Sequence, residues 1–146
     1  MSVAEQLIIE RLTELFDQVQ IDDLQFVIES IDLIEASAID RCHNQTTVVK
    51  LELRESNQSI YIPNLFLPPA MRGLGIAMRI LWIIHIIGQS LGYRVYLTLV
   101  TETTQLHMLQ RGAKLTGEAD VLEIVKGTNL YSKDDQNNNL YLRVRL

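Results

Sequence analysis

Residues 68–77 read Pro-Pro-Ala-Met-Arg-Gly-Leu-Gly-Ile-Ala. The two prolines cannot donate hydrogen bonds to a strand ladder, so they end the apolar run before them, and an apolar segment of helical length follows the glycines. The first turn of a helix leaves about four backbone N–H groups unpaired, and glycines let that backbone approach an anion closely. Arg72 adds a positive charge. The segment is therefore predicted to bind phosphate between a strand and a helix.

The segments on either side of this turn predict a strand, helix and strand unit. Residues 49–54 alternate apolar and charged side chains, and residues 59–67 follow as the return strand of a hairpin. A helix is expected from Ile76 to about Ser90, ended by Gly92 in the left-handed conformation. Residues 94–100 are apolar on nearly both faces, which suits an interior position in a sheet.

The first third of the chain is predicted to be helical. Apolar residues recur at three- and four-residue spacing from Val3 to Val19. Asp22 and Gln25 resemble a capping pair, and the helical period continues after them to about Ile39. We therefore expect two helices within residues 1–42.

The last third is predicted to return to the sheet. Residues 105–110 are expected to be helical and to stop at Gly112, and strands are expected at 121–125 and 140–146. The whole chain is thus predicted to have a mixed α/β fold, with the sheet within residues 46–146.

Length and composition restrict the class of protein. The chain has 146 residues, 47% of them hydrophobic and 21% charged, which predicts one globular domain spanning residues 1–146. Its single cysteine, Cys42, can form neither an internal disulfide nor a thiolate metal site, so we expect no metal and a reducing, cytoplasmic location.

Charge and hydropathy indicate what the protein does not bind. Glu5 and Glu10 stand where a signal peptide would carry basic residues, and the longest uncharged stretch, residues 80–93, is shorter than the roughly 18 to 20 residues needed to span a bilayer. We therefore expect no membrane association. A net charge of −5 argues against nucleic acid and favours cationic partners.

Three nucleotide-binding patterns compete for the glycine turn. A dinucleotide fingerprint requires a small residue where Met78 stands, and a P-loop requires a lysine that this turn lacks. The pattern that fits is a pyrophosphate cradle, Arg-x-x-Gly-x-Ala, formed by Arg72, Gly75 and Ala77.

This pattern, preceded by Leu65-Phe-Leu67 and followed by a helix and a strand, resembles the GNAT N-acetyltransferases over residues 60–115. The resemblance implies a GNAT-like acyl-CoA-binding fold whose two parallel strands splay apart, with acetyl-CoA as cofactor and an amine as acceptor. The backbone of residues 65–67 would pair with pantetheine, and the amides of the turn would hold the pyrophosphate. The residues so implied in cofactor binding are Leu65, Phe66, Leu67, Arg72, Gly73, Leu74, Gly75, Ile76 and Ala77, with Thr101 and Thr103 after the second strand.

The sequence departs from the family at the catalytic positions. The family's proton-donating tyrosine falls on Met108, counted four residues back from Gly112, and a thioether cannot donate a proton. His107, Tyr96 or a water would have to substitute. The family's base falls at Tyr61, a poor base near neutral pH, so Glu102 is the better candidate.

Three functions are compatible with these features. The first is an acetyl-CoA-dependent N-acetyltransferase acting on a primary amine of a small molecule or protein. The second, kept open by Met108, is a catalytically degenerate CoA-binding sensor or protein-interaction module. The third is an unrelated interaction domain with a chance glycine turn. The helix at 76–90 is apolar on nearly all sides, so either the N-terminal helices or a second subunit, in a homodimer, must cover its second face.

Overall fold

The computed structural model describes residues 2–19, 21–98 and 100–131, and the strand predicted at 140–146 lies outside them. In chain order the elements are α1 (Val3–Gln18), β1 (Gln25–Ser30), β2 (Ile34–Ile39), β3 (Gln45–Arg54), β4 (Ser59–Leu65), the 3-10 turn η1 (Pro69–Met71), α2 (Ile76–Leu91), β5 (Arg94–Leu97), α3 (Glu102–Gln110), β6 (Lys114–Leu115) and β7 (Leu122–Ile124).

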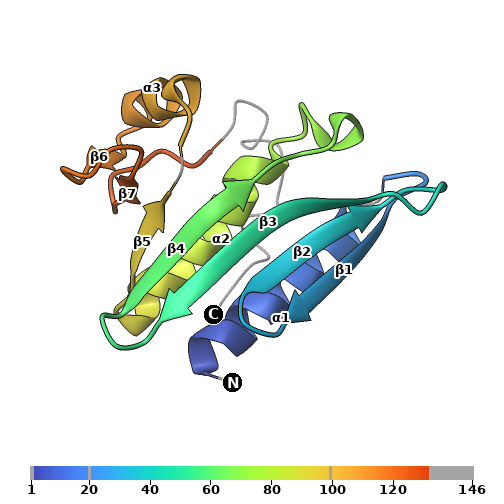
Figure 1. Cartoon of the computed structure of the whole chain (residues 1–146), viewed down its shortest axis with the longest axis horizontal. Helices are drawn as coiled ribbons and strands as arrows, with labels where there is room; N and C mark the ends of the chain where they lie inside the picture. The colour runs from blue at the N-terminus through green and yellow to red at the C-terminus, as the bar shows by residue number, and fades with distance from the viewer. Residues whose placement is uncertain (1, 20, 99, 132–146) are drawn as a thin grey trace.

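The strands form one sheet in the order β1-β2-β3-β4-β5-β7-β6. Of these neighbours, β4 and β5 run parallel and are connected by α2, whereas the other pairs are antiparallel. Both α1 and α2 lie on one face of the sheet (Figure 1). This confirms the predicted mixed α/β fold, the interior position of β5, and the strand, helix and strand order on which the resemblance to GNAT proteins rests.

The predicted second helix is wrong. Residues 25–39 form the antiparallel pair β1 and β2, and Asp22 lies in a turn rather than at a helix cap. Ile31, which the helical stripe required to be buried, is 88% exposed, while Phe26 stacks on Phe16 of α1 with ring centroids 4.7 Å apart. The many β-branched residues of this stretch fit a strand period as well as a helical one, and pairing with β3 decides between them.

Helix α2 packs closely against the sheet, beside α1 (Figure 1). A Cβ at Gly88 would lie 3.0 Å from Val95 Cγ2 and 3.4 Å from Ile60 Cδ1, so the helix backbone sits directly against β4 and β5. Its other side contacts α1, whose stripe of Ile8, Leu12 and Leu15 is buried. Hence α1 provides cover for the second face of α2. Within the described ranges, no helix is both long and apolar enough to cross a membrane.

A β-bulge in β4 separates that strand from β5. Tyr61 and Asn64 of β4 pair with Glu52 and Lys50 of β3, so two β4 residues stand opposite one residue of β3. One of the two is Pro63, which has no N–H to offer a neighbouring strand. The parallel pairing of β4 with β5 ends beside the bulge, and the two strands diverge toward their carboxyl ends (Figure 1).

Candidate functional site

A cleft of about 400 Å³ opens where β4 and β5 separate. The two strands pair up to Ile62 and Leu97, and Thr98 N–H donates to Ile62 O at 3.1 Å. Helix α2 borders the cleft on one side and α3 on another. The side chains and backbone around it come from Ile62, Pro63, Asn64, Leu65, Phe66, Ala77, Met78, Leu81, Leu97, Thr98, Val100, Thr101, Thr104, His107 and Met108.

The glycine turn leads directly into α2. Gly73 and Gly75 have φ values of +80° and +73°, in the left-handed region that glycine adopts without a steric cost, and Gly75 is the N-cap residue of the helix. As a glycine, the N-cap residue has no side chain with which to bind these N–H groups. The first backbone N–H groups of α2 are therefore oriented toward the loop, as a phosphate-binding turn requires.

Arg72 stabilises the link between the strand end and the turn. Its Nε donates to Leu67 O at 2.9 Å, and its guanidinium lies 5.4 Å from the centre of the Phe66 ring. The side chain is exposed. Arg72 thus holds the chain that connects β4 to α2 while its charge stays at the surface beside the glycines.

The structure brings most of the predicted cofactor-binding residues together at one end of α2. Leu65, Phe66, Ala77 and Thr101 border the cleft. Leu67, Arg72, Gly73, Leu74, Gly75 and Ile76 form the chain that enters the helix, and the side chain of Ile76 is fully buried, so only its backbone can contact a ligand. The remaining residue, Thr103, lies in the exposed first turn of α3 and is not among the described residues that border the cleft.

The predicted catalytic residues separate into two groups. Met108 and His107 both border the cleft, and Met108 is buried. Glu102 is exposed in the first turn of α3 and is not among the described residues around the cleft. Thr101 caps α3, because its Oγ1 accepts from Thr104 N–H at 3.3 Å. The geometry therefore brings His107, rather than Glu102, to the cleft.

Sequence reasoning missed the residue that orients His107. Arg111 Nε donates to His107 Nε2 at 3.0 Å, and Arg111 Nη1 donates to the carbonyl oxygens of Asn129 and Tyr131 at 2.9 and 2.8 Å. A nitrogen that accepts a hydrogen bond carries no proton, so this arrangement assigns the ring proton to Nδ1.

The bulge beside the cleft also escaped the sequence reasoning. Pro63 belongs to this bulge and Asn64 follows it, and a proline inside an otherwise strand-like run is the signal that could have located it.

The structure places Tyr96, which the sequence suggested as a substitute proton donor, away from the cleft. Its ring stacks on that of Tyr61 with ring centroids 5.3 Å apart. Both tyrosines border a different cavity.

Comparisons with known proteins give similarities in structure alone. No family model matches the sequence, and no curated protein matches it. One similar solved structure is nourseothricin acetyltransferase, with a TM-score of 0.41 and 12% identity over 71% of this chain and 84% of that one. Another is a protein from Agrobacterium tumefaciens assigned as an acetyltransferase, with a TM-score of 0.38 and 15% identity over 84% of this chain and 92% of that one. Both neighbours are acetyltransferases, and similarity at these identities concerns the fold.

Proposed function

We propose that this protein is an acetyl-CoA-dependent N-acetyltransferase that transfers an acetyl group to a primary amine. The observation that carries the proposal is the separation of the parallel strands β4 and β5 directly beside a glycine turn at the start of α2. In such an opening, the backbone N–H and C=O groups along the separated strand can bind a chain that contains amides, while the turn offers its backbone N–H groups to a phosphate.

The residues around the opening fit the cofactor. Pairing with β5 stops at Ile62, so on that side residues 63–65 face the cleft instead of a strand, and the amides of a pantetheine arm can bond to them. Gly73 and Gly75 give the backbone of the turn a conformation that other residues rarely adopt, and a Cβ at Gly73 would meet nothing within 4 Å. The backbone at Gly73 thus has open space beside it, as the approach of a pyrophosphate requires.

Acetyl-CoA supplies an acetyl group activated as a thioester: the amine nitrogen bonds to the acetyl carbon, the C–S bond breaks, the amine loses one proton, and the thiolate gains one. Phe66 N–H already donates to Val48 O at 2.8 Å. Because the N–H of Phe66 is used in this way, we assign the next one, that of Leu67, as the donor to the thioester carbonyl oxygen, which becomes negatively charged during the reaction. A donor of this kind contributes about 2.7 to 4 kcal/mol in other enzymes.

His107 assists the leaving thiolate as a hydrogen-bond donor. With Nε2 bound to Arg111, its Nδ1 carries the proton that it can offer to sulfur. A neutral imidazole is a weak acid, so the proton that the thiolate finally takes up comes from water. Glu102 is exposed at the start of α3, outside the cleft, so we assign it the role of base for the amine through a water that relays the proton.

One observation favours the second candidate function, a CoA-binding protein without catalysis. Met108 borders the cleft at the position where the family has its proton donor. Loss of a general acid typically lowers a rate 10²- to 10⁴-fold. A protein that binds CoA and transfers nothing would share the turn and the cleft with the enzyme.

Release of free thiol from acetyl-CoA, measured with a panel of primary amines, tests the proposal. We expect amine-dependent release that Glu102→Gln and His107→Gln each slow, while Glu29→Gln on the distant strand β1 leaves the rate unchanged. If acetyl-CoA binds and no amine accelerates release, the CoA-binding function is correct. If release is independent of Glu102, the assignment of the base is wrong.

A further inference from the structure

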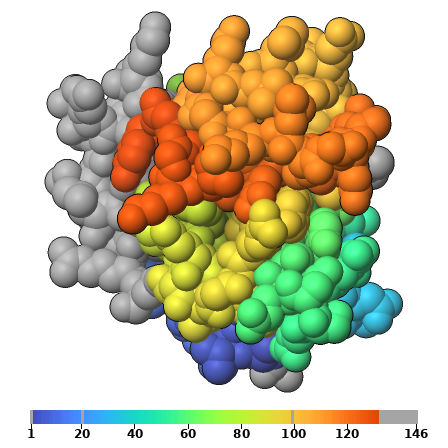
Figure 2. All heavy atoms as spheres, turned by 90° about the vertical axis from the view of Figure 1, so that its left-hand side faces the viewer, coloured from blue at the N-terminus to red at the C-terminus, as the bar shows by residue number. Residues whose placement is uncertain are grey.

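A second cavity lies on the face of the sheet opposite α1 and α2. Along β4, Ile60 and Ile62 are buried toward the helices, and Tyr61 between them faces the other way, as does its register partner Tyr96 on β5. The cavity has a volume of about 360 Å³. Figure 2 views the molecule from the left-hand side of Figure 1 and shows the β3–β4 hairpin (green) below the chain around β6 and β7 (orange). The polar residues around the cavity are Tyr61, Arg94, Tyr96, Thr116, Glu118 and Glu123.

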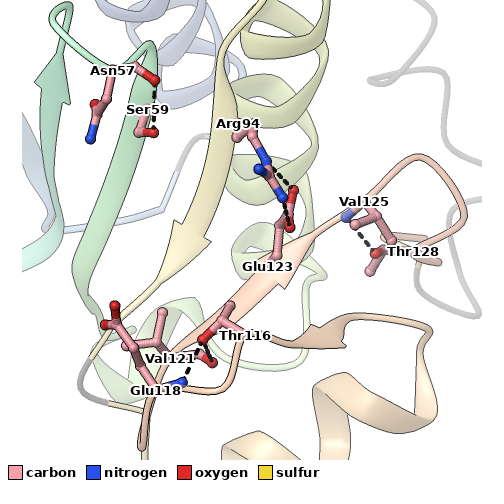
Figure 3. A network of polar contacts seen from close by, with 9 residues as sticks. All are labelled: Asn57, Ser59, Arg94, Thr116, Glu118, Val121, Glu123, Val125 and Thr128. Carbon is pink, nitrogen blue, oxygen red and sulfur yellow. Dashed lines mark hydrogen bonds and ion pairs between the residues drawn. The ribbon is translucent and has the colours of Figure 1, made fainter.

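Negative charge is in excess around this cavity. Among the described residues that border it, the one guanidinium is that of Arg94, which is bound to the carboxylate of Glu123 through two hydrogen bonds of 3.0 and 2.7 Å (Figure 3). Glu118 brings a second carboxylate on the turn before β7. That turn is fixed by Thr116, whose Oγ1 accepts from Glu118 N–H at 3.2 Å and donates to Val121 O at 3.0 Å. Arg54, which lies over the Tyr61 ring, is itself paired with Glu52. Among the described residues, the second carboxylate therefore has no matching cation around the cavity, which favours a positively charged ligand.

The two tyrosines contribute hydroxyl oxygens rather than ring faces, and the Tyr61 hydroxyl already accepts one hydrogen bond, from Asn57 Nδ2 at 3.3 Å. Their rings stack on each other, and the guanidiniums of Arg54 and Arg94 lie 4.3 and 5.7 Å from the centres of Tyr61 and Tyr96. Burial raises the pKa of Tyr96, and the negative charge of Glu123 raises it further, so the side chain stays a neutral phenol. Phenol and carboxylate oxygens together suit a ligand group rich in N–H donors, such as an ammonium.

The cavity borders the point where β4 and β5 separate. Tyr61 and Tyr96 form the row of the parallel ladder just before the last pair, Ile62 and Leu97. One residue along a strand is about 3.3 Å, so the tyrosine row is next to the start of the cleft. The cavity and the cleft thus approach the same opening in the sheet from its two faces.

We infer that this cavity binds the acceptor substrate, and that the acceptor is a small aliphatic diamine. An amine must be uncharged to attack the thioester, so the positive charge that the cavity favours has to belong to a second group of the same molecule. One ammonium would contact Glu118 and the tyrosine oxygens while the other, neutral nitrogen reaches the opening. A volume of about 360 Å³, partly open to solvent, is the size of a small-molecule site. The inference rests on the proposed function and specifies its acceptor.

Titration of the protein with 1,4-diaminobutane, without acetyl-CoA and followed by NMR chemical shifts, tests the inference. We expect saturable binding that 1,4-butanediol, an uncharged molecule of the same length, does not show. Glu118→Gln should raise the Kd about two- to fivefold, the range for one exposed ion pair. The matched control is Glu29→Gln, which removes an exposed carboxylate from β1 and should leave the Kd unchanged.

The results separate this inference from the proposed function. No binding of the diamine, equal binding of the diol, or equal effects of Glu118→Gln and Glu29→Gln would each overturn it, and so would tighter binding of a lysine-containing peptide than of the diamine. Binding of acetyl-CoA is measured independently. If the diamine binds through Glu118 and acetyl-CoA does not bind, the cavity is an ammonium site, and its role as an acceptor site fails together with the acetyltransferase proposal.

Discussion

Acetyl-CoA should stabilise this protein against heat through the glycine turn, and Gly75→Glu should abolish that effect. A ligand at 100 times its Kd adds about 2.7 kcal/mol to the free energy of unfolding. For 146 residues the entropy of unfolding is about 0.3 kcal/mol/K, from roughly 2.1 cal/mol/K per residue, so the melting midpoint should rise by about 9 °C. Differential scanning fluorimetry with and without acetyl-CoA measures this shift directly.

The variant has to be judged by its shift rather than by its midpoint. Gly75 has a φ of +73°, so any other residue there costs roughly 1 to 2 kcal/mol and lowers the midpoint even without ligand. Gly117→Glu is the matched control, because Gly117 has a φ of +88° and open space around its Cβ position, and gains the same charge away from the turn. We expect the control to keep the shift of about 9 °C. If the shift survives in Gly75→Glu, or is lost equally in Gly117→Glu, the assignment of the turn is refuted. If acetyl-CoA causes no shift in the wild type, both the enzyme and the CoA-binding sensor are excluded.

Two further predictions concern stability. Gly88→Val should destabilise the fold by about 1 to 3 kcal/mol in urea denaturation, because a Cβ there already lies 3.0 Å from Val95 Cγ2. Gly127→Val, with nothing within 4 Å of its Cβ position, should change the midpoint little, and equal effects of the two variants would contradict the close packing of α2 on the sheet. Burial lowers the pKa of His85 from 6.5, so the unfolded chain takes up a proton more readily than the folded one, and stability should fall as the pH drops below about 6.5. His85→Leu should show a shallower loss of the urea midpoint between pH 7 and pH 5, and a slope as steep as that of the wild type would show that other groups cause it.

The unit from β3 to β5 could be predicted from the sequence because its signals are local. Pro68 and Pro69 end a strand, Gly75 begins a helix, and Gly92 ends it in the left-handed conformation with a φ of +83°. Each of these residues restricts its own backbone, whatever the rest of the chain does. Helix α1 was predictable for a related reason, because its apolar stripe fits the helical period alone.

Strands β1 and β2 could not be predicted in the same way. Between residues 22 and 39 the apolar side chains satisfy both periods, and what selects the strand is the exposed edge of β3, which no local pattern records. The orientation of His107 has the same origin, because Arg111 is itself held by the carbonyl oxygens of Asn129 and Tyr131, which lie 18 and 20 residues away. The geometry of the candidate site therefore depends on contacts between distant segments.

The bulge in β4 connects the local signals to the function. Pro63 lies in the bulge at the point where the parallel pairing ends. Ile62 O accepts from Thr98 N–H of β5, so the nitrogen of Pro63 in the same trans peptide faces β3, and its missing N–H interrupts the ladder with β3. On the helix side of the sheet, the opening between β4 and β5 holds an apolar cleft bordered by strand backbone that β5 does not pair with. On the other side of the sheet lies the cavity with excess negative charge. The two proposed substrates differ in charge in a corresponding way. The thioester is carried on a long neutral arm, and the amine is carried on a cationic molecule. The two faces of the opening are thus suited to two different substrates, and the reaction that we propose requires the two to meet there.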